Sequence, residues 1–363
     1  QKSRKTPGQS FFTNIHLFKQ SSVIEAITNH QSTLVCPLNN QQQTIHVRID
    51  CLVPDLALND VRCKVDFNDI KMGRKIGEGG FADVFEATWQ DRTVAVKVLH
   101  VANETDPFAM NLNQLSSGTV IESYDEFQRE AWTMSGLHHP NLVRLLGVSM
   151  KPLALIVEFV PLGSLDDILR AKRTQYGAAS STNTNALLSW DIQLRIMLDV
   201  ADGMRYLHST MPATIHRDLK SPNILISSLD ATAKVVAKVG DFGTSDVLAP
   251  TLKGRTTYCP YWIAPEILSD KDAEYTEKID IYAFGVIAWE ILTCQEPFSE
   301  YDDEYKGAPT VCFEEAVVKG LRPTIPNTTS PVLKTIIEEC WQTNPELRPS
   351  FNLIYVRLFA LKK

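Results

Sequence analysis

A glycine-rich turn between two strand-like segments constrains the fold of this chain more than any other feature. It runs from Ile76 to Val84 as Ile-Gly-Glu-Gly-Gly-Phe-Ala-Asp-Val, and the missing side chains would allow the backbone to close over phosphate groups. An ordinary structural turn and a dinucleotide-binding turn are the two alternatives. A dinucleotide site needs a helix directly after the glycines, whereas Phe85–Leu99 continues as strand and lacks breakers. The turn is therefore expected to join two strands of a compact sheet.

A lysine, Lys97, ends the strand-like run Val94-Ala95-Val96. Taken alone it is best explained as a surface lysine at a strand edge. The next predicted helix offers a partner, since Glu130 lies between Phe127 and Met134 of its apolar stripe and is expected to face the sheet. The alternative for Glu130 is one more solvated charge. We expect the two side chains to pair and to hold the α- and β-phosphates of a nucleotide.

The octapeptide His-Arg-Asp-Leu-Lys-Ser-Pro-Asn ends at Asn223 and is followed 18 residues on by Asp241-Phe242-Gly243. A single aspartate in a loop is more often a turn former or a helix cap than a catalyst. Phosphoryl transfer requires a carboxylate that orients a hydroxyl, oxygen ligands for magnesium and cations on the developing phosphate charge. Asp218 can supply the first, Asn223 and Asp241 the second, and Lys220 the third.

In this order, the three features resemble the signature set of protein kinases, and the similarity covers about residues 68–358. The resemblance implies an α+β, two-lobed fold, with a small β-rich N-lobe that holds one helix and a larger α-helical C-lobe. The expected bounds are 1–65 for a small β-rich extension, 66–160 for the N-lobe and 161–363 for the C-lobe. The implied reaction is transfer of the γ-phosphate of ATP to protein hydroxyls, with Mg²⁺.

The same resemblance assigns site residues. The implied catalytic residues are Asp218, Lys220, Lys97 and Glu130, and the implied metal ligands are Asn223 and Asp241. The implied nucleotide-binding residues are Ile76, Gly77, Glu78, Gly79, Gly80, Phe81, Ala82, Val84, Ala95, Lys97, Glu158, Val160 and Leu225. Among these, Glu158–Val160 would be the hinge for adenine. The resemblance further implies that Asp280 anchors the catalytic loop and that Arg348 pairs with Glu266, where a helix cap and a surface charge are the plain alternatives.

The motifs that distinguish kinase subgroups resemble two different groups in this chain. Lys220-Ser221-Pro222-Asn223 resembles the serine/threonine form of the loop, whereas Cys340-Trp341 and Arg348-Pro349-Ser350 resemble the tyrosine-kinase-like group. Within that group, Leu321–Pro326 and Pro54-Asp55-Leu56 resemble the Roco family, which includes the leucine-rich-repeat kinases. In that family a Ras-like GTPase and a COR region precede the kinase. Residues from about 33 to 60 are thus expected to be the tail of a COR region, and any other β-rich extension is the alternative. The partners implied are protein substrates, GTPase and COR domains of the same full-length chain, and a second copy in a dimer.

Two positions depart from the kinase pattern. Ala82 replaces the third glycine, which is tolerable if its backbone stays extended. Cys259 stands where serine/threonine kinases usually have a threonine, although another register would let Thr256 or Thr257 serve. A pseudokinase that acts as a scaffold is the rival hypothesis, and it rests on these two departures. Arg217 can pair with a phosphate in the activation segment, so autophosphorylation at Thr256 or Thr257 is expected to raise activity.

Composition excludes several classes of function. A formal net charge of −7 argues against nucleic acid as the main partner. The seven cysteines are odd in number, scattered and without a CxxC pair, so neither a disulfide framework nor a zinc site is expected, which suits the cytoplasm. No apolar run is long enough for a transmembrane helix. Because the chain begins at Gln1 rather than at a methionine, it is expected to be a piece of a longer protein.

Overall fold

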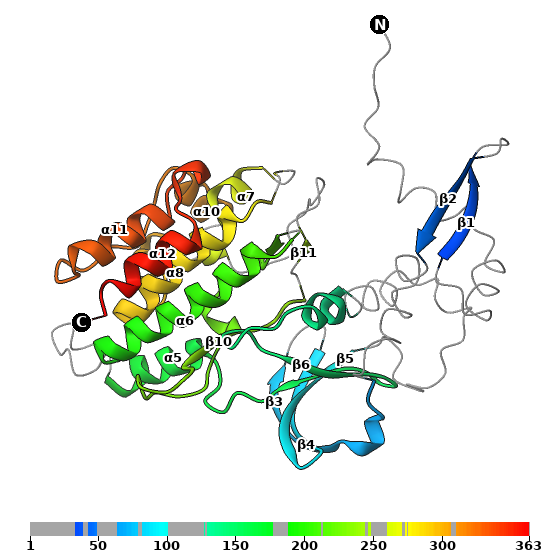
Figure 1. Cartoon of the computed structure of the whole chain (residues 1–363). Coiled ribbons are helices and arrows are strands. Elements are labelled where there is room, and N and C mark those ends of the chain that lie inside the picture. The colour runs from blue at the N-terminus through cyan, green and yellow to red at the C-terminus, as the bar shows by residue number, and fades with distance from the viewer. Residues whose placement is uncertain are drawn as a thin grey trace, which may run out of the picture. The chain divides into compact units, whose positions relative to one another are not determined.

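The structure is a computed structural model that describes residues 33–38, 43–48, 64–78, 82–100, 127, 129–176, 188–211, 213–243, 246–247, 260–270, 273, 275–305 and 310–362. The chain divides into two compact units, Gln1–Lys64 and Val65–Lys363. The described part of the first unit is an antiparallel hairpin of β1 (Thr33–Leu38) and β2 (Gln43–Arg48). The second unit has two lobes, one built on a sheet and one on helices (Figure 1). The α+β, two-lobed fold that was predicted is confirmed.

The first lobe is a five-stranded antiparallel sheet in the order β3-β4-β5-β7-β6. Its strands are β3 (Lys71–Glu78), β4 (Ala82–Trp89), β5 (Arg92–Leu99), β6 (Leu145–Met150) and β7 (Leu153–Glu158). The glycine-rich turn joins β3 to β4, and the chain then continues as β5, as the sequence predicts. Strand β6 begins only at Leu145, because the Val143 amide donates to the carbonyl of Val239 in the other lobe, at 2.8 Å.

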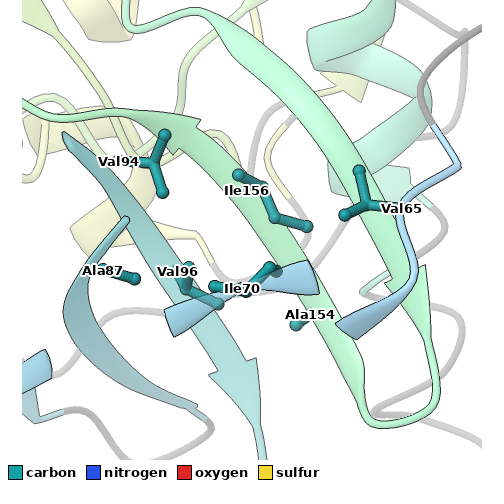
Figure 2. Packing of buried hydrophobic residues seen from close by; sticks show 7 residues of the cluster. All are labelled: Val65, Ile70, Ala87, Val94, Val96, Ala154 and Ile156. Carbon is teal, nitrogen blue, oxygen red and sulfur yellow. The ribbon is translucent and has the colours of Figure 1, made fainter. Parts of the chain in front are cut away.

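The outer face of this sheet is covered by the chain segment that leads into it. Alternate residues of β5 point to opposite faces, and Val94 and Val96 point outward, where they are fully buried. Val65 and Ile70, which flank the short helical turn η2 (Phe67–Asp69), close this cluster together with Ile156 of β7 (Figure 2). The other β5 face, which carries Ala95 and Lys97, is therefore left to form the site.

The second lobe packs around α8 (Lys278–Thr293), whose residues Ile279–Ile291 are all buried. The sequence predicted a buried helix here because the segment is apolar nearly all round. Helix α6 (Trp190–Ser209) packs against both α8 and α12. The remaining α-helices are α5 (Leu165–Tyr176), α7 (Pro265–Ser269), α9 (Asp302–Tyr305), α10 (Thr310–Val318), α11 (Pro331–Cys340) and α12 (Phe351–Phe359).

Short paired strands carry the loops that form the site. Strand β9 (Ile224–Ile226) pairs with β10 (Ala237–Val239), and β8 (Thr214–Ile215) pairs with β11 (Asp246–Val247). Between β8 and β9 lies the turn η4 (Ser221–Asn223), and the other short turns are η5 (Pro260–Trp262), η6 (Ser299–Tyr301) and η7 (Pro345–Leu347). Asp218 and Asp241 thus sit on neighbouring loops, although 23 residues separate them in the chain. In the part of the chain that the structure describes, no helix is both long and apolar enough to cross a membrane.

Candidate active site

The lysine at the end of β5 meets two carboxylates. Lys97 Nζ donates to both side-chain oxygens of Glu130, each at 2.9 Å, and to Asp241 Oδ1 at 3.0 Å. Glu130 belongs to the helical residues 129–135 and is only 4% exposed. The predicted contact between Lys97 and Glu130 is confirmed, and Asp241 extends it to the second lobe.

Charge, more than burial, determines the protonation of this cluster. Burial alone would lower the pKa of Lys97, but the nearby charges of Glu130 and Asp241 outweigh it and hold that pKa above its usual value. Burial alone would raise the pKa of Asp241, yet the charge and hydrogen bond of Lys97 hold it below its usual value. Lys97 is therefore cationic and Asp241 ionised at neutral pH. One positive and two negative charges leave a formal excess of one negative charge, which favours a further cation.

The loop that follows β8 is organised around Asp218. Lys220 Nζ donates to Asp218 Oδ2 at 2.7 Å. The side-chain amide of Asn223 donates to the same carboxylate oxygen at 3.0 Å and to the Asp218 carbonyl at 2.8 Å. Because these bonds use the nitrogen of the Asn223 amide, its oxygen is the atom that is suited to a metal ion. The three residues that the octapeptide predicts to act together are thus in direct contact.

A buried carboxylate on α8 holds the beginning of this loop. The backbone amides of His216 and Arg217 donate to the two oxygens of Asp280, each at 2.9 Å, and His208 Nε2 lies 2.8 Å from Oδ2. Arg217 has a positive φ of 68°, a left-handed conformation that costs energy for a residue with a side chain. The bonds to Asp280 therefore maintain a backbone bend that would otherwise be unfavourable. The predicted anchoring contact of Asp280 is confirmed, whereas the part played by His208 was not predicted.

Residues 70–358 match the family described as protein tyrosine and serine/threonine kinase. The chain belongs to the protein kinase family. Its relatives in Dictyostelium discoideum include the probable serine/threonine-protein kinase pats1, which is 41% identical over 317 residues, and the probable serine/threonine-protein kinase roco7, which is 39% identical over 325 residues. A third, the probable serine/threonine-protein kinase roco5, is 33% identical over 351 residues. These matches cover 87%, 88% and 95% of this chain but only 9%, 11% and 12% of the relatives. The predicted likeness to the Roco kinases is therefore confirmed.

Protein kinases use ATP and Mg²⁺, and the oxygen groups of this kinase domain fit that metal. The carboxylate of Asp241 and the amide oxygen of Asn223 are hard ligands, and Mg²⁺ keeps water and phosphate oxygens in the rest of its shell. The Asp241 side chain is 47% exposed, so an ion can reach it. Among the described residues, no three His, Cys, Asp or Glu side chains form a metal-binding group by themselves. A magnesium ion here would be shared between these two residues and the nucleotide.

The structure describes most of the residues that were predicted to bind the nucleotide. Ala82 lies in β4 opposite Leu99, so its backbone is extended and the departure from glycine is tolerated, as expected. Ala95 and Val160 are buried, Leu225 is partly buried, and Ile76 is 42% exposed. A side chain at Gly77 would come within 3.3 Å of Val84, next to the turn. Gly79, Gly80 and Phe81 lie outside the described residues.

The Glu158 side chain is held by one residue from each lobe. Its Oε1 accepts a hydrogen bond from Lys238 Nζ of β10 and another from the Arg144 backbone amide, both at 2.9 Å. A role of Glu158 in binding adenine must therefore come from its backbone, because its carboxylate is already engaged. Sequence reasoning did not identify Lys238, whose position in a three-residue strand carries no distinctive pattern.

The remaining predictions for the activation segment stay open. Cys259, Thr256 and Thr257 lie outside the described residues, so neither the threonine question nor autophosphorylation is tested. Arg217, which was expected to bind a phosphate, lies with its guanidinium carbon 4.5 Å from the centre of the Tyr275 ring. The His216 and Phe242 rings pack against each other in the core, with their centroids 5.3 Å apart.

Replacing Lys97 by methionine is expected to lower kcat/KM for ATP by roughly 100-fold, because it removes the cation and leaves two carboxylates facing each other. Arg74 provides a matched control on the same sheet, since its Nε donates to Glu86 at 2.8 Å and neither residue was assigned to the site. R74M should change kcat/KM by less than about threefold, which is the range expected for an exposed ion pair. Steady-state kinetics with an ATP titration measure both values, and equal losses in the two variants would contradict the role of Lys97.

Proposed function

We propose that this domain is a serine/threonine kinase that transfers the γ-phosphate of ATP to protein hydroxyls with the help of Mg²⁺. The main support is a pair of side-chain groups: Lys97 contacts Asp241 across the lobes, and Asp218 contacts Lys220 and Asn223 on the neighbouring loop. The two loops are bonded to each other through the backbone, since the Gly240 amide, next to Asp241, donates to the Asn223 carbonyl at 2.9 Å. Phosphoryl transfer depends mostly on positioning and electrostatic stabilisation, and this group can supply both. A scaffold without activity would not need both of these groups.

Each residue has a distinct task in the proposed reaction. The Asp218 carboxylate, oriented by Asn223 and Lys220, accepts the proton of the attacking hydroxyl. Lys97 is fixed by Glu130 and neutralises charge on the α- and β-phosphates, while Lys220 does the same at the transferred group. Bound Mg²⁺ would add positive charge next to the phosphates, where Asn223 and Asp241 would hold it.

The preference for serine and threonine has two supports. The loop sequence Lys220-Ser221-Pro222 resembles the serine/threonine form, and the relatives pats1, roco7 and roco5 are named as probable serine/threonine kinases. Because the chain spans about a tenth of those relatives, we also propose that it is the kinase module of a larger Roco-type protein in the cytoplasm. In that protein, residues 1–65 would end a COR region and a GTPase domain would lie upstream.

A direct assay tests this function. The domain is incubated with MgATP and a mixture of peptides that contain serine, threonine or tyrosine, and the phosphorylated sites are determined by mass spectrometry. We expect phosphate on serine and threonine, and loss of nearly all transfer in D218N, which keeps the shape of Asp218 but removes its charge. Transfer to tyrosine alone would contradict the proposed specificity. Nucleotide binding without any transfer would favour the pseudokinase hypothesis.

A further inference from the structure

A buried carboxyl group on α8 connects two segments that serve different parts of a kinase. Glu290 is 1% exposed. Its Oε1 accepts a hydrogen bond from the Ser221 hydroxyl, and its Oε2 accepts one from the indole N–H of Trp262, both at 2.8 Å. Ser221 directly follows Lys220 in the catalytic loop, whereas Trp262 lies two residues before Ala264-Pro265-Glu266, where the activation segment ends. One side chain thus links both segments.

Such a group is costly in this position. All residues of α8 from Ile279 to Ile291 are buried, and burial raises the pKa of Glu290 to about 8, although the bonds from Trp262 and Ser221 act in the opposite direction. An apolar side chain would fill the same place without that desolvation penalty. The benefit of a carboxyl group here lies in the two hydrogen bonds that it accepts.

Both segments are held firmly on their other sides. The turn η5 is fixed by Tyr261, whose ring packs against Phe298 and Phe313 with centroids 6.1 and 5.6 Å apart. Ser221 is fully buried in η4, the same turn that carries Asn223. Because Glu290 is bonded to both segments and Ser221 is fully buried, a displacement of Trp262 is expected to be transmitted through Glu290 to the catalytic loop.

We propose that Glu290 is a positioning residue for phosphoryl transfer, which ties the catalytic loop to the end of the activation segment through Ser221 and Trp262. The loop then reaches its productive geometry only when the turn at Trp262 is in place. This inference rests on the proposed kinase function. It adds to that function a physical link through which the end of the activation segment controls the position of Asp218 and Lys220.

The chemistry of the link distinguishes two substitutions of Glu290. An indole N–H can only donate, whereas a serine hydroxyl can either donate or accept. Glutamine can therefore keep both contacts, since its oxygen accepts from Trp262 while its nitrogen donates to Ser221. Leucine has a similar size but removes both contacts and leaves two buried polar groups without a partner.

The first test measures kcat and KM for ATP in E290Q and E290L with a peptide substrate. E290Q should stay within about threefold of wild type in kcat, whereas E290L should lose roughly 10- to 30-fold in kcat with KM for ATP little changed. An E290L variant with wild-type kcat would overturn the proposal. So would an E290Q variant that loses as much as E290L, because a side chain that can keep both contacts would then not preserve kcat.

A second test uses the two ends of the link and does not depend on E290L folding. S221A and W262F should each lower kcat about 10-fold, and the double variant should lose little more, because either change alone breaks the same connection. Multiplied losses of about 100-fold would overturn the link.

W289F is the matched control. Trp289 is buried on α8 and, like Trp262, donates its indole N–H, but to the Thr324 carbonyl at 2.9 Å. W289F should lower the melting temperature as W262F does, without the loss in kcat. A wild-type domain that transfers no phosphate would instead refute the proposed function itself.

Discussion

Replacement of Asp241 by asparagine is expected to lower kcat by roughly 1,000-fold while the domain remains folded. Asparagine has nearly the same shape, and its oxygen can still accept the hydrogen bond that Lys97 donates to Oδ1 at 3.0 Å. What disappears is one negative charge. Lys97, Glu130 and residue 241 would then sum to zero, so the cluster would no longer attract a further cation. The reaction should therefore need much more Mg²⁺ in D241N, and kinase assays over a series of Mg²⁺ concentrations measure this shift.

Asp199 provides the control for D241N. It is another aspartate of the C-lobe, but a buried one, and its Oδ2 accepts hydrogen bonds from the amides of Val236 and Ala237, at 2.7 and 3.0 Å. D199N should lower the melting temperature, because it weakens two buried bonds next to β10, but it should leave the Mg²⁺ dependence of kcat as in wild type. If D241N kept kcat within tenfold of wild type, or if both variants shifted the Mg²⁺ dependence alike, Asp241 would not be a metal ligand.

The sequence predicted those contacts whose partners each belong to a distinctive motif. Lys97 and Glu130 are 33 residues apart, but a strand that ends in a lysine and a helix with an acid inside its apolar stripe require each other. Asp280 was placed correctly only through the family resemblance. Its contacts depend on the left-handed backbone conformation of Arg217, and no local pattern of residues predicts that bend.

The sequence contains an indication of one other feature, the buried Glu290, but none of Lys238. Within Ile279–Ile291, the only charged residues are Asp280 and Glu290, and an acid in an otherwise apolar helix needs hydrogen-bond partners. The pattern could therefore have indicated Glu290, but not that Ser221 and Trp262 are its partners. For Lys238 no signal exists, because a three-residue strand is too short to carry a distinctive pattern, and its bond to Glu158 arises from how the lobes meet.

The largest effect on stability is expected from Arg348. Its side chain is 0% exposed and donates to both oxygens of Glu266 at 2.7 Å, and also to the carbonyls of Lys278 and Gln342 at 2.9 and 2.8 Å. R348A would leave the Glu266 carboxylate and these carbonyls without their partner, which typically costs about 3–5 kcal/mol when a buried pair loses one member. For a domain of this size the melting temperature should fall by roughly 6–10 °C.

Arg357 allows this prediction to be tested against an exposed pair of the same chemistry. Its guanidinium bonds to Glu339, but both side chains are about one-third exposed, at 35% and 34%. R357A should therefore change stability by no more than about 1 kcal/mol. R348K should fall between wild type and R348A, because lysine keeps the charge but cannot donate to both oxygens of Glu266 in the planar arrangement of arginine. Thermal unfolding of the three variants measures the order. Equal losses of melting temperature in R348A and R357A would mean that burial of the Arg348–Glu266 pair adds nothing to stability beyond its charge. A surface ion pair could then replace this link between the activation segment and η7.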